Sequence, residues 1–302
     1  MAKGPERTAQ HYGPGVTGAS QSVLAELMTL LGPYRESLVL VGGWAPYFLL
    51  KQNQRPEDDF VHVGSIDIDF AVDMSRLPQE AYATITELLG ERGYEPLAQR
   101  RGAGLPSSFE RTARSPVTEK PYKIRVDFLT GIEAGAESKA LRRTVQESLL
   151  ARKVRGCEAA FKHQTVFDLE GLLPDQGLVR VAVRMADVVS CLTMKGIVLG
   201  ERFREKDAYD IYAVAAHYKN GPADVAAALK PYGDDPLVQE AMRQIAGAFS
   251  SRRASGPTWA ASFLISPLFA AEHERVRTDA FMVVDALVEA LGLKRGAAEK
   301  IV

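Results

Sequence analysis

Residues 65–73 read Ser-Ile-Asp-Ile-Asp-Phe-Ala-Val-Asp, and apolar residues occupy every second position of this stretch: Ile66, Ile68, Phe70 and Val72. Successive side chains of a β-strand point to opposite faces, so the pattern predicts a strand with one apolar face and one acidic face. Asp67 and Asp69 share the acidic face, roughly 7 Å apart along the backbone. Unpaired carboxylates are costly to bury, so this pair needs a cation.

A strand and a glycine turn precede the acidic strand. Residues Ser37 to Val41 are nearly all apolar, which predicts a short buried strand that ends at Gly42 and Gly43. A helix from Trp44 to Lys51 is predicted to follow. Because glycine has no Cβ, phosphate oxygens can approach the backbone N–H groups where that helix begins, and Ser65 is a candidate to add a hydroxyl to the same phosphate.

A third carboxylate is predicted on a neighbouring strand. Residues Ser108 to Ala113 and Tyr122 to Leu129 alternate in polarity as a hairpin would, and Asp127 lies on the polar face of the second strand. Asp67, Asp69 and Asp127 are thus candidates to hold two Mg²⁺ or Mn²⁺ ions about 3.5 to 4 Å apart. Such a pair suits phosphoryl transfer, with Asp127 placed to accept the proton of the attacking hydroxyl.

The fold class predicted from these patterns is α/β (α+β), a mixed sheet with flanking helices followed by a C-terminal helical domain. Residues 1–18 show no periodicity and are expected to be a loose arm. Residues 19–155 are expected to form the catalytic domain, and residues 156–302 a mainly helical domain.

Helical periodicity is found in nine further segments, the first of them with Ser20 as its expected cap. Short strand-like pieces are expected between Thr165 and Val183, and only helices after Arg184. The nine predicted helices are Ser20–Leu31, Pro78–Gly93, Ala136–Arg152, Met185–Leu199, Phe203–Tyr218, Ala223–Leu229, Leu237–Phe249, Trp259–Phe269 and His273–Leu291.

The composition excludes several classes of protein. The 302 residues include 37 Lys and Arg against 38 Asp and Glu, so a nucleic acid would have to meet a local basic patch. Two distant cysteines, Cys157 and Cys191, argue against a zinc ribbon or a disulfide framework. The five histidines lack ligand spacing. Without a signal peptide or an apolar span, the protein is expected to be soluble and cytoplasmic.

One basic patch is a candidate to guide RNA phosphates, although its members also suit solvated surfaces. It consists of Arg100, Arg101, Arg142, Arg143, Arg152, Lys153 and Arg155.

The order Gly42-Gly43, Ser65-x-Asp67-x-Asp69 and Asp127 resembles the DNA polymerase β-like nucleotidyltransferases. A second segment is similar to the helical signature of the AbiEii toxin branch of that superfamily, and the whole resemblance spans roughly Leu38 to Tyr218. That branch includes toxins of type IV and related toxin–antitoxin systems, some of which add nucleotides to the acceptor end of tRNA. The second segment consists of Met194-Lys195, Arg202, Arg204, Lys206-Asp207 and Tyr209-Asp210-Ile211-Tyr212.

The resemblance implies Mg²⁺ at Asp67 and Asp69, and catalytic roles for Lys195 and for Asp207 or Asp210. It also implies partners: an NTP, a tRNA acceptor and a cognate antitoxin protein, with no membrane. The residues that contact the nucleotide would include Gly42, Gly43, Ser65, Lys195, Arg204 and Lys206.

Simpler interpretations remain open for some of these residues. Lys195 lies among apolar residues and could extend from a packed helix to solvent. Lys206 and Asp210 are four residues apart and could form an ordinary ion pair on a helix. Asp73, at the end of the acidic strand, is assigned as a helix cap rather than a metal ligand.

Two other functions remain open. The acceptor could be a small cationic molecule such as an aminoglycoside, attracted by Glu57-Asp58-Asp59, or a protein side chain. Alternatively, the chain could be a non-catalytic nucleotide-binding module that regulates a partner.

Overall fold

The computed structural model describes residues 7–78, 83–97, 105–132, 141–174, 177–201 and 205–293. The chain divides into two compact units. The sheet unit comprises residues 12–45 and 64–190, and the helical unit comprises 46–63 together with the residues before 12 and after 190. Each unit is therefore assembled from separate stretches of sequence.

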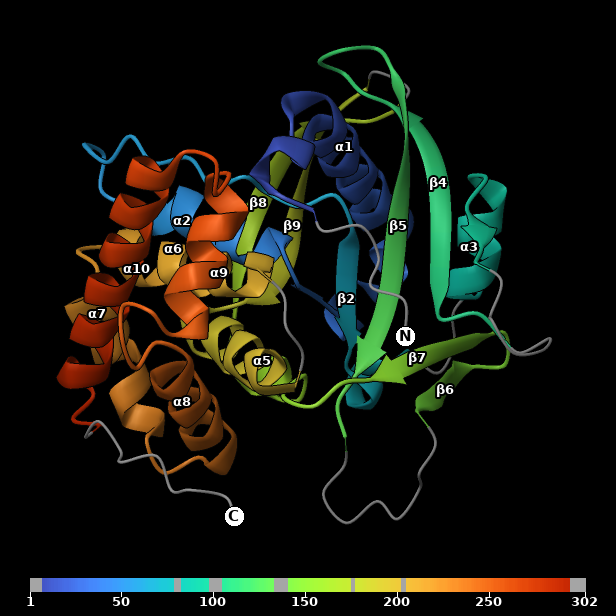
Figure 1. Ribbon diagram of the computed structural model, residues 1–302. Coiled ribbons are helices and arrows are strands. Elements are labelled where there is room, and N and C mark those ends of the chain that lie inside the picture. Colours follow the sequence, from blue (N-terminus) through green and yellow to red (C-terminus); the bar gives the residue numbers. More distant parts are fainter. Residues whose placement is uncertain are drawn as a thin grey trace. The chain divides into compact units, whose positions relative to one another are not determined.

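The described part of the sheet unit contains one nine-stranded mixed sheet (Figure 1). Its main path has the order β3-β4-β5-β2-β1-β9-β8, while β7 pairs with β5 and β6. Strands β2 and β5 run parallel, whereas β1 is antiparallel to β2 and parallel to β9. The strands are β1 Leu38–Val41, β2 Ile68–Val72, β3 Glu95–Pro96, β4 Ser108–Arg114, β5 Pro121–Thr130, β6 Arg142–Gln146, β7 Leu149–Lys153, β8 Gln164–Leu172 and β9 Leu178–Ala186.

Helix α1, Pro14–Leu30, packs on β4, β5, β8 and β9, across the sheet as Figure 1 shows. It begins earlier than predicted, because proline suits the first turn of a helix, so the expectation of a loose arm is wrong for residues 14–18. Ser20 is not a cap but is buried within α1, where its hydroxyl accepts a hydrogen bond of 3.0 Å from the Trp44 indole. The 3₁₀ helices η1, Ala9–His11, and η2, Gly32–Ser37, flank α1.

The strands that carry the predicted acids are confirmed, with one shorter than expected. The predicted hairpin corresponds to β4 and β5, and the buried strand before the glycines corresponds to β1. Strand β2 includes only residues 68–72 of the predicted 65–73, so Asp67 lies just before the strand. Asp73 caps the 3₁₀ helix η3, Met74–Arg76, with its carboxylate accepting from the Ser75 N–H at 3.0 Å, as assigned from the sequence.

The predicted helix Ala136–Arg152 is wrong in its described part. Residues 142–146 and 149–153 form the hairpin β6–β7, and β7 adds to the edge of β5. Val145 and Leu149 become buried there, so pairing with a strand distant in sequence outweighs local helical periodicity. The strand-like pieces around Thr165 to Val183 are two full strands, and β9 continues to Ala186, two residues beyond the predicted onset of helices.

Two short helices complete the sheet unit. Helix α3, Ile85–Glu91, begins with a capping box between Thr84 and Glu87 and is the described part of the predicted helix Pro78–Gly93, of which residues 79–82 lie outside the description. Helix α4 spans Ala159–Lys162. The predicted boundary at residue 155 falls between β7 and α4, and β8 and β9 beyond it belong to the same sheet.

The helical unit confirms the predicted run of C-terminal helices. Helices α6, α9 and α10 pack on one another, and α7 packs on α6 and α10 (Figure 1). The chain passes between the two units within α2, Trp44–Asn53, and within α5, Val188–Glu201. The other helices are α6 Glu205–His217, α7 Pro222–Leu229, η4 Lys230–Tyr232, α8 Pro236–Ala248, α9 Ser255–Leu264 and α10 Ala270–Ala290.

These elements confirm the α/β class predicted from the sequence, a mixed sheet with flanking helices and a helical C-terminal region. Within the described ranges, every helix is too short or too polar to cross a lipid bilayer.

Candidate functional site

The predicted acids meet on neighbouring strands of the sheet unit. Asp69 of β2 lies directly opposite Asp127 of β5 in the parallel register, and Asp67 lies two residues before Asp69. Adjacent strands are about 4.8 Å apart, so these backbone positions bring the three side chains within reach of one another. Asp127 is buried, whereas Asp67 and Asp69 are partly exposed. We refer to Asp67, Asp69 and Asp127 as the acidic cluster.

Gly42 is required where β1 meets the acidic cluster. Its φ of +68° is a conformation that side chains other than glycine rarely adopt, and a Cβ at this position would overlap the carboxylate of Asp69. Val41, the preceding residue, is paired with Asp69 across the strands. The glycine turn thus makes room for the Asp69 carboxylate, in addition to the phosphate contact that the sequence predicts.

Two arginines lie against the acidic cluster. The Arg125 Nε donates to Asp127 Oδ1 at 2.8 Å, and its Nη2 donates to the Ser108 hydroxyl at 3.2 Å. An Arg152 nitrogen lies 3.9 Å from the other Asp127 oxygen. Partial burial lowers the pKa of Arg125, but the carboxylates of Asp127, Asp67 and Asp69 raise it by a larger amount. The net shift of this pKa is therefore upward. All three acids therefore act on one guanidinium.

The acidic cluster has the donor chemistry that Mg²⁺ prefers, since carboxylate oxygens are hard ligands. The guanidinium on Asp127 also shows that this position attracts a cation. Among the residues that the structure describes, however, no three His, Cys, Asp or Glu side chains are arranged as a ready metal-binding set. The chemistry of the cluster fits a divalent ion, and the Asp127 carboxylate is engaged by arginine.

Ser65 is tied to the same region through its hydroxyl, which donates to the backbone carbonyl of Asp67 at 2.8 Å. The neighbouring Gly64 has a φ of +77°, and the Trp44 ring packs against it. These contacts fix the turn that leads into β2. The predicted phosphate contact of Ser65 stays a prediction.

The other predicted site residues form a second cluster, which lies in the helical unit. The Lys195 ammonium is 2.7 Å from Asp207 and 2.6 Å from Asp210, and the Lys206 ammonium is 2.7 Å from Asp210. His62 completes it, with Nε2 at 3.0 Å from Asp210. These five residues are called the buried ion cluster below. Two ammonium groups balance two carboxylates, which is the condition for burying charge.

The buried ion cluster shifts the pKa values of its members. Burial would raise the pKa of Asp210, but the ammonium groups of Lys195 and Lys206 hold it well below its usual range. Burial lowers the pKa of His62 to about 4, and the two lysines add to this effect, while the hydrogen bond to Asp210 opposes it. His62 is therefore neutral at pH 7. The nucleotide contacts predicted for Lys195 and Lys206 stay predictions beside these ion pairs.

Tyr209 holds the segment before the acidic strand onto α6. Its ring stacks on His62 at 5.0 Å and on Phe263 at 4.8 Å, and its hydroxyl accepts a hydrogen bond of 3.2 Å from the Val63 N–H. Further along, Phe60 stacks on His217 at 3.8 Å. Residues 60–63 are thus fixed to α6 by aromatic contacts.

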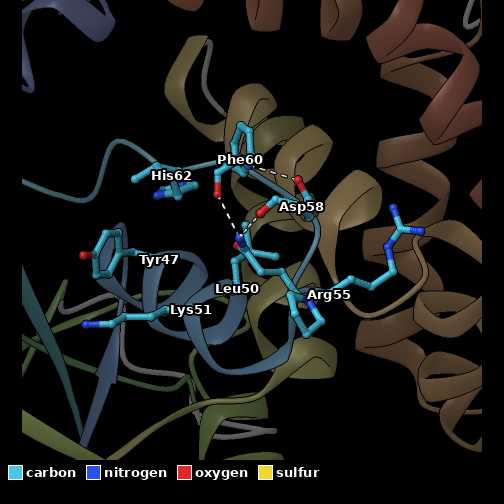
Figure 2. A pocket seen from close by; sticks show the side chains of 10 residues that line it. Tyr47, Leu50, Lys51, Arg55, Asp58, Phe60 and His62 are labelled. Atoms are coloured by element: carbon cyan, nitrogen blue, oxygen red, sulfur yellow. Dashed lines mark hydrogen bonds between the residues drawn. The ribbon is translucent and has the colours of Figure 1, made fainter.

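A pocket of about 370 Å³ lies between α2 and this segment. Figure 2 shows Tyr47 and Lys51 projecting from α2 to one side of the pocket and Arg55 pointing to the other. Asp58, one of the acids considered for attracting a cationic acceptor, is bound to His217 at 2.7 Å. One carboxylate of that loop is thus engaged by a hydrogen-bond partner within the helical unit.

The six predicted catalytic residues thus divide between two clusters, each within one unit. Sequence reasoning missed Arg125 and His62. The alternation of β5 places Arg125 on the face of Asp127, which is a signal that could have been used, whereas His62 meets Asp210 across 148 residues of sequence. Arg204 and Arg202 lie outside the described residues, as do Arg100 and Arg101 of the basic patch.

The chain matches no protein-family model, and no curated protein is significantly similar to it. Among solved structures, it is similar to a candidate nucleotidyltransferase from H. pylori, with 14% identity and a TM-score of 0.37 over 90% of this chain and 96% of that chain. It is also similar to JHP933 from Helicobacter pylori, with 14% identity and a TM-score of 0.36 over 90% of this chain and 94% of that chain. These distant likenesses assign neither an activity nor a substrate to the chain.

Proposed function

We propose that the protein is a Mg²⁺-dependent nucleotidyltransferase that moves an NMP group from an NTP to a hydroxyl acceptor. The observation that carries the proposal is the register of Asp69 opposite Asp127 on parallel strands, beside a glycine turn that only glycine can make without displacing Asp69. The residue pattern that resembles the nucleotidyltransferases thus corresponds to one place in the sheet unit.

Each residue has a separate part in the proposed reaction. Asp67, Asp69 and Asp127 would hold the metal, which would supply Lewis-acid stabilisation of the triphosphate. Gly42 and Gly43 leave the backbone N–H groups at the start of α2 accessible to phosphate oxygens. The acceptor oxygen attacks the α-phosphorus, pyrophosphate leaves, and the Asp127 carboxylate takes the hydroxyl proton.

We further propose that the acceptor is tRNA and that the protein is a toxin with a cognate antitoxin, acting in the cytoplasm. The support is the β6–β7 hairpin, where Arg142 lies directly opposite Arg152. The two guanidinium groups place positive charge on this hairpin, beside the contact of Arg152 with Asp127, and positive charge is what attracts a polyanion such as RNA. Lys153 lies on β7, which pairs alongside β5, and it is opposite Thr130, three residues beyond Asp127.

The acceptor is identified by incubating the chain with each labelled NTP in the presence of tRNA, total protein or an aminoglycoside. Label is expected in tRNA, with release of pyrophosphate, and Asp69→Asn is expected to lower the rate by at least about 10³-fold, since one carboxylate of the metal set is lost. Asp168→Asn is the matched control, because this aspartate lies on β8 of the same sheet and pairs with Arg180 at the surface.

Other outcomes identify the alternatives. Label in protein or in the aminoglycoside would reject the RNA acceptor but keep the enzyme class. Tight NTP binding without pyrophosphate release in any of the three mixtures would leave a regulatory nucleotide-binding module. Full activity of Asp69→Asn would reject the acidic cluster as the active site.

A further inference from the structure

The Arg125 guanidinium contacts the acidic cluster and engages one of the two carboxylate oxygens of Asp127. Its Nε is 2.8 Å from Asp127 Oδ1, and its Nη2 reaches Ser108, the residue paired with Asp127 on β4. The guanidinium of Arg125 is therefore held by two of its donors, one bound to Asp127 and the other to Ser108 on the adjacent strand. Arg152, at 3.9 Å from the second Asp127 oxygen, is a looser contact.

The position of Arg125 follows from the strand. Arg125 and Asp127 are two residues apart on β5, so both side chains leave the same face of the sheet. The guanidinium is about half exposed, while the Asp127 carboxylate is nearly covered. An arginine that is open to solvent on one side can turn away without disturbing the core, whereas the carboxylate cannot follow it.

A divalent cation that bound Asp127 through Oδ1 would need the oxygen atom that already accepts the Arg125 hydrogen bond. A charge-assisted hydrogen bond of this kind is among the stronger ones in proteins, so an ion that takes Oδ1 must first release the arginine. A divalent cation and the Arg125 guanidinium would also repel each other if both contacted Asp127.

We propose that Arg125 is a resident counter-ion that competes with the divalent cation for Asp127, so that the metal affinity of the acidic cluster is set by the release of Arg125. This inference rests on the proposed function, because it assigns the metal to the same three carboxylates. It adds a residue that the nucleotidyltransferase resemblance does not include.

Mn²⁺ alone is the probe, with its dissociation constant measured by calorimetry and by the loss of the free-ion EPR signal. Arg125→Gln is expected to bind Mn²⁺ about tenfold more tightly than the unaltered chain, which corresponds to about 1.4 kcal/mol. Lys123→Gln is the matched control: it removes the same charge from the same face of β5, where Lys123 pairs with Glu110 instead. Its affinity is expected to change less than threefold.

A second variant separates the effect of removing Arg125 from an effect of misfolding. Arg125→Lys keeps the charge but lacks the planar pair of donors, so its affinity is expected between those of the unaltered chain and Arg125→Gln. Equal affinities of all three, or weaker binding in Arg125→Gln, overturn the competition while leaving the metal site intact, provided that Asp69→Asn abolishes binding. If no variant binds Mn²⁺, or Asp69→Asn binds it normally, the proposed function fails together with this inference.

Discussion

At the scale of single residues, Gly42 is the position where backbone conformation and site geometry depend on each other. Its positive φ and its closeness to the Asp69 carboxylate are two separate reasons why a side chain is excluded. A turn that needed only the conformation would tolerate asparagine, but here any Cβ meets the carboxylate. A side chain at this position is therefore expected to affect both the stability of the sheet unit and the proposed activity.

We expect Gly42→Ala to destabilise the sheet unit by about 1–3 kcal/mol, because alanine at positive φ is strained and Asp69 must move. Transfer activity should fall at least as far as in Asp69→Asn. Urea denaturation and the labelling reaction measure the two effects. Gly90→Ala is the control, since this glycine lies within α3 with open space around its Cα and alanine favours a helix. Normal activity of Gly42→Ala would show that Asp69 can be displaced without harm.

At the scale of elements, local patterns predicted the structure where a strand or helix could be recognised alone. The alternation of polarity in β2, β4 and β5 was sufficient to predict these strands, and the periodicity of the C-terminal segments was sufficient to predict their helices. The β6–β7 hairpin was mistaken for a helix because its burial depends on β5, which the sequence pattern cannot reveal. The contact between His62 and Asp210 was missed for the same reason. The two residues are far apart in the sequence and meet only when the segment that contains His62 packs on α6.

The attachment of residues 60–63 to α6 is expected to depend on pH through His62. Its pKa is about 4 in the folded chain and about 6.5 in an unfolded one, so protonation favours unfolding. The contribution of neutral His62 to the free energy of unfolding is complete above pH 6.5. As the pH falls from 6.5 to 4, this contribution is lost, and the free energy of unfolding decreases by up to about 3 kcal/mol.

Urea denaturation at intervals between pH 7 and pH 4.5 measures this slope, and His62→Gln is the comparison. Glutamine can still donate to Asp210 but does not titrate, so the slope over this interval should be reduced. Lys195 and Asp210 remain charged throughout, because the pKa of Lys195 is raised and that of Asp210 is lowered, and only below about pH 4 does the depressed pKa of Asp210 add its own loss of stability. An unchanged slope in His62→Gln would mean that other groups control the acid sensitivity.

At the scale of the whole molecule, the chain is not divided into consecutive domains. Residues 46–63 belong with the helical unit although both flanking stretches belong with the sheet unit. Strand β1 lies between β2 and β9, so the middle of the sheet combines residues from both sides of the predicted boundary at 155. A boundary predicted from the sequence falls where the residue pattern changes, here at residue 155. In the structure, strands from both sides of residue 155 pair within the same sheet.

A chain that ends at residue 155 is expected to be unfolded or aggregated, because β1 would lack its neighbour β9, and residues 46–63 would lack α6. Circular dichroism and size-exclusion chromatography of this fragment, beside the full chain, test the expectation. A soluble, cooperatively unfolding fragment would instead support a domain boundary at 155.

The pairing of Leu40 with Met185 has a consequence for synthesis on the ribosome. Strands β1, β2 and β5 can associate once residue 130 has emerged, but the other edge of the all-apolar β1 stays uncovered until β9 follows. At about 5–20 residues per second, that delay lasts several seconds, during which an open hydrophobic edge is exposed to other nascent chains. The yield of native protein in cells should therefore depend on chaperones that bind the nascent chain during this interval.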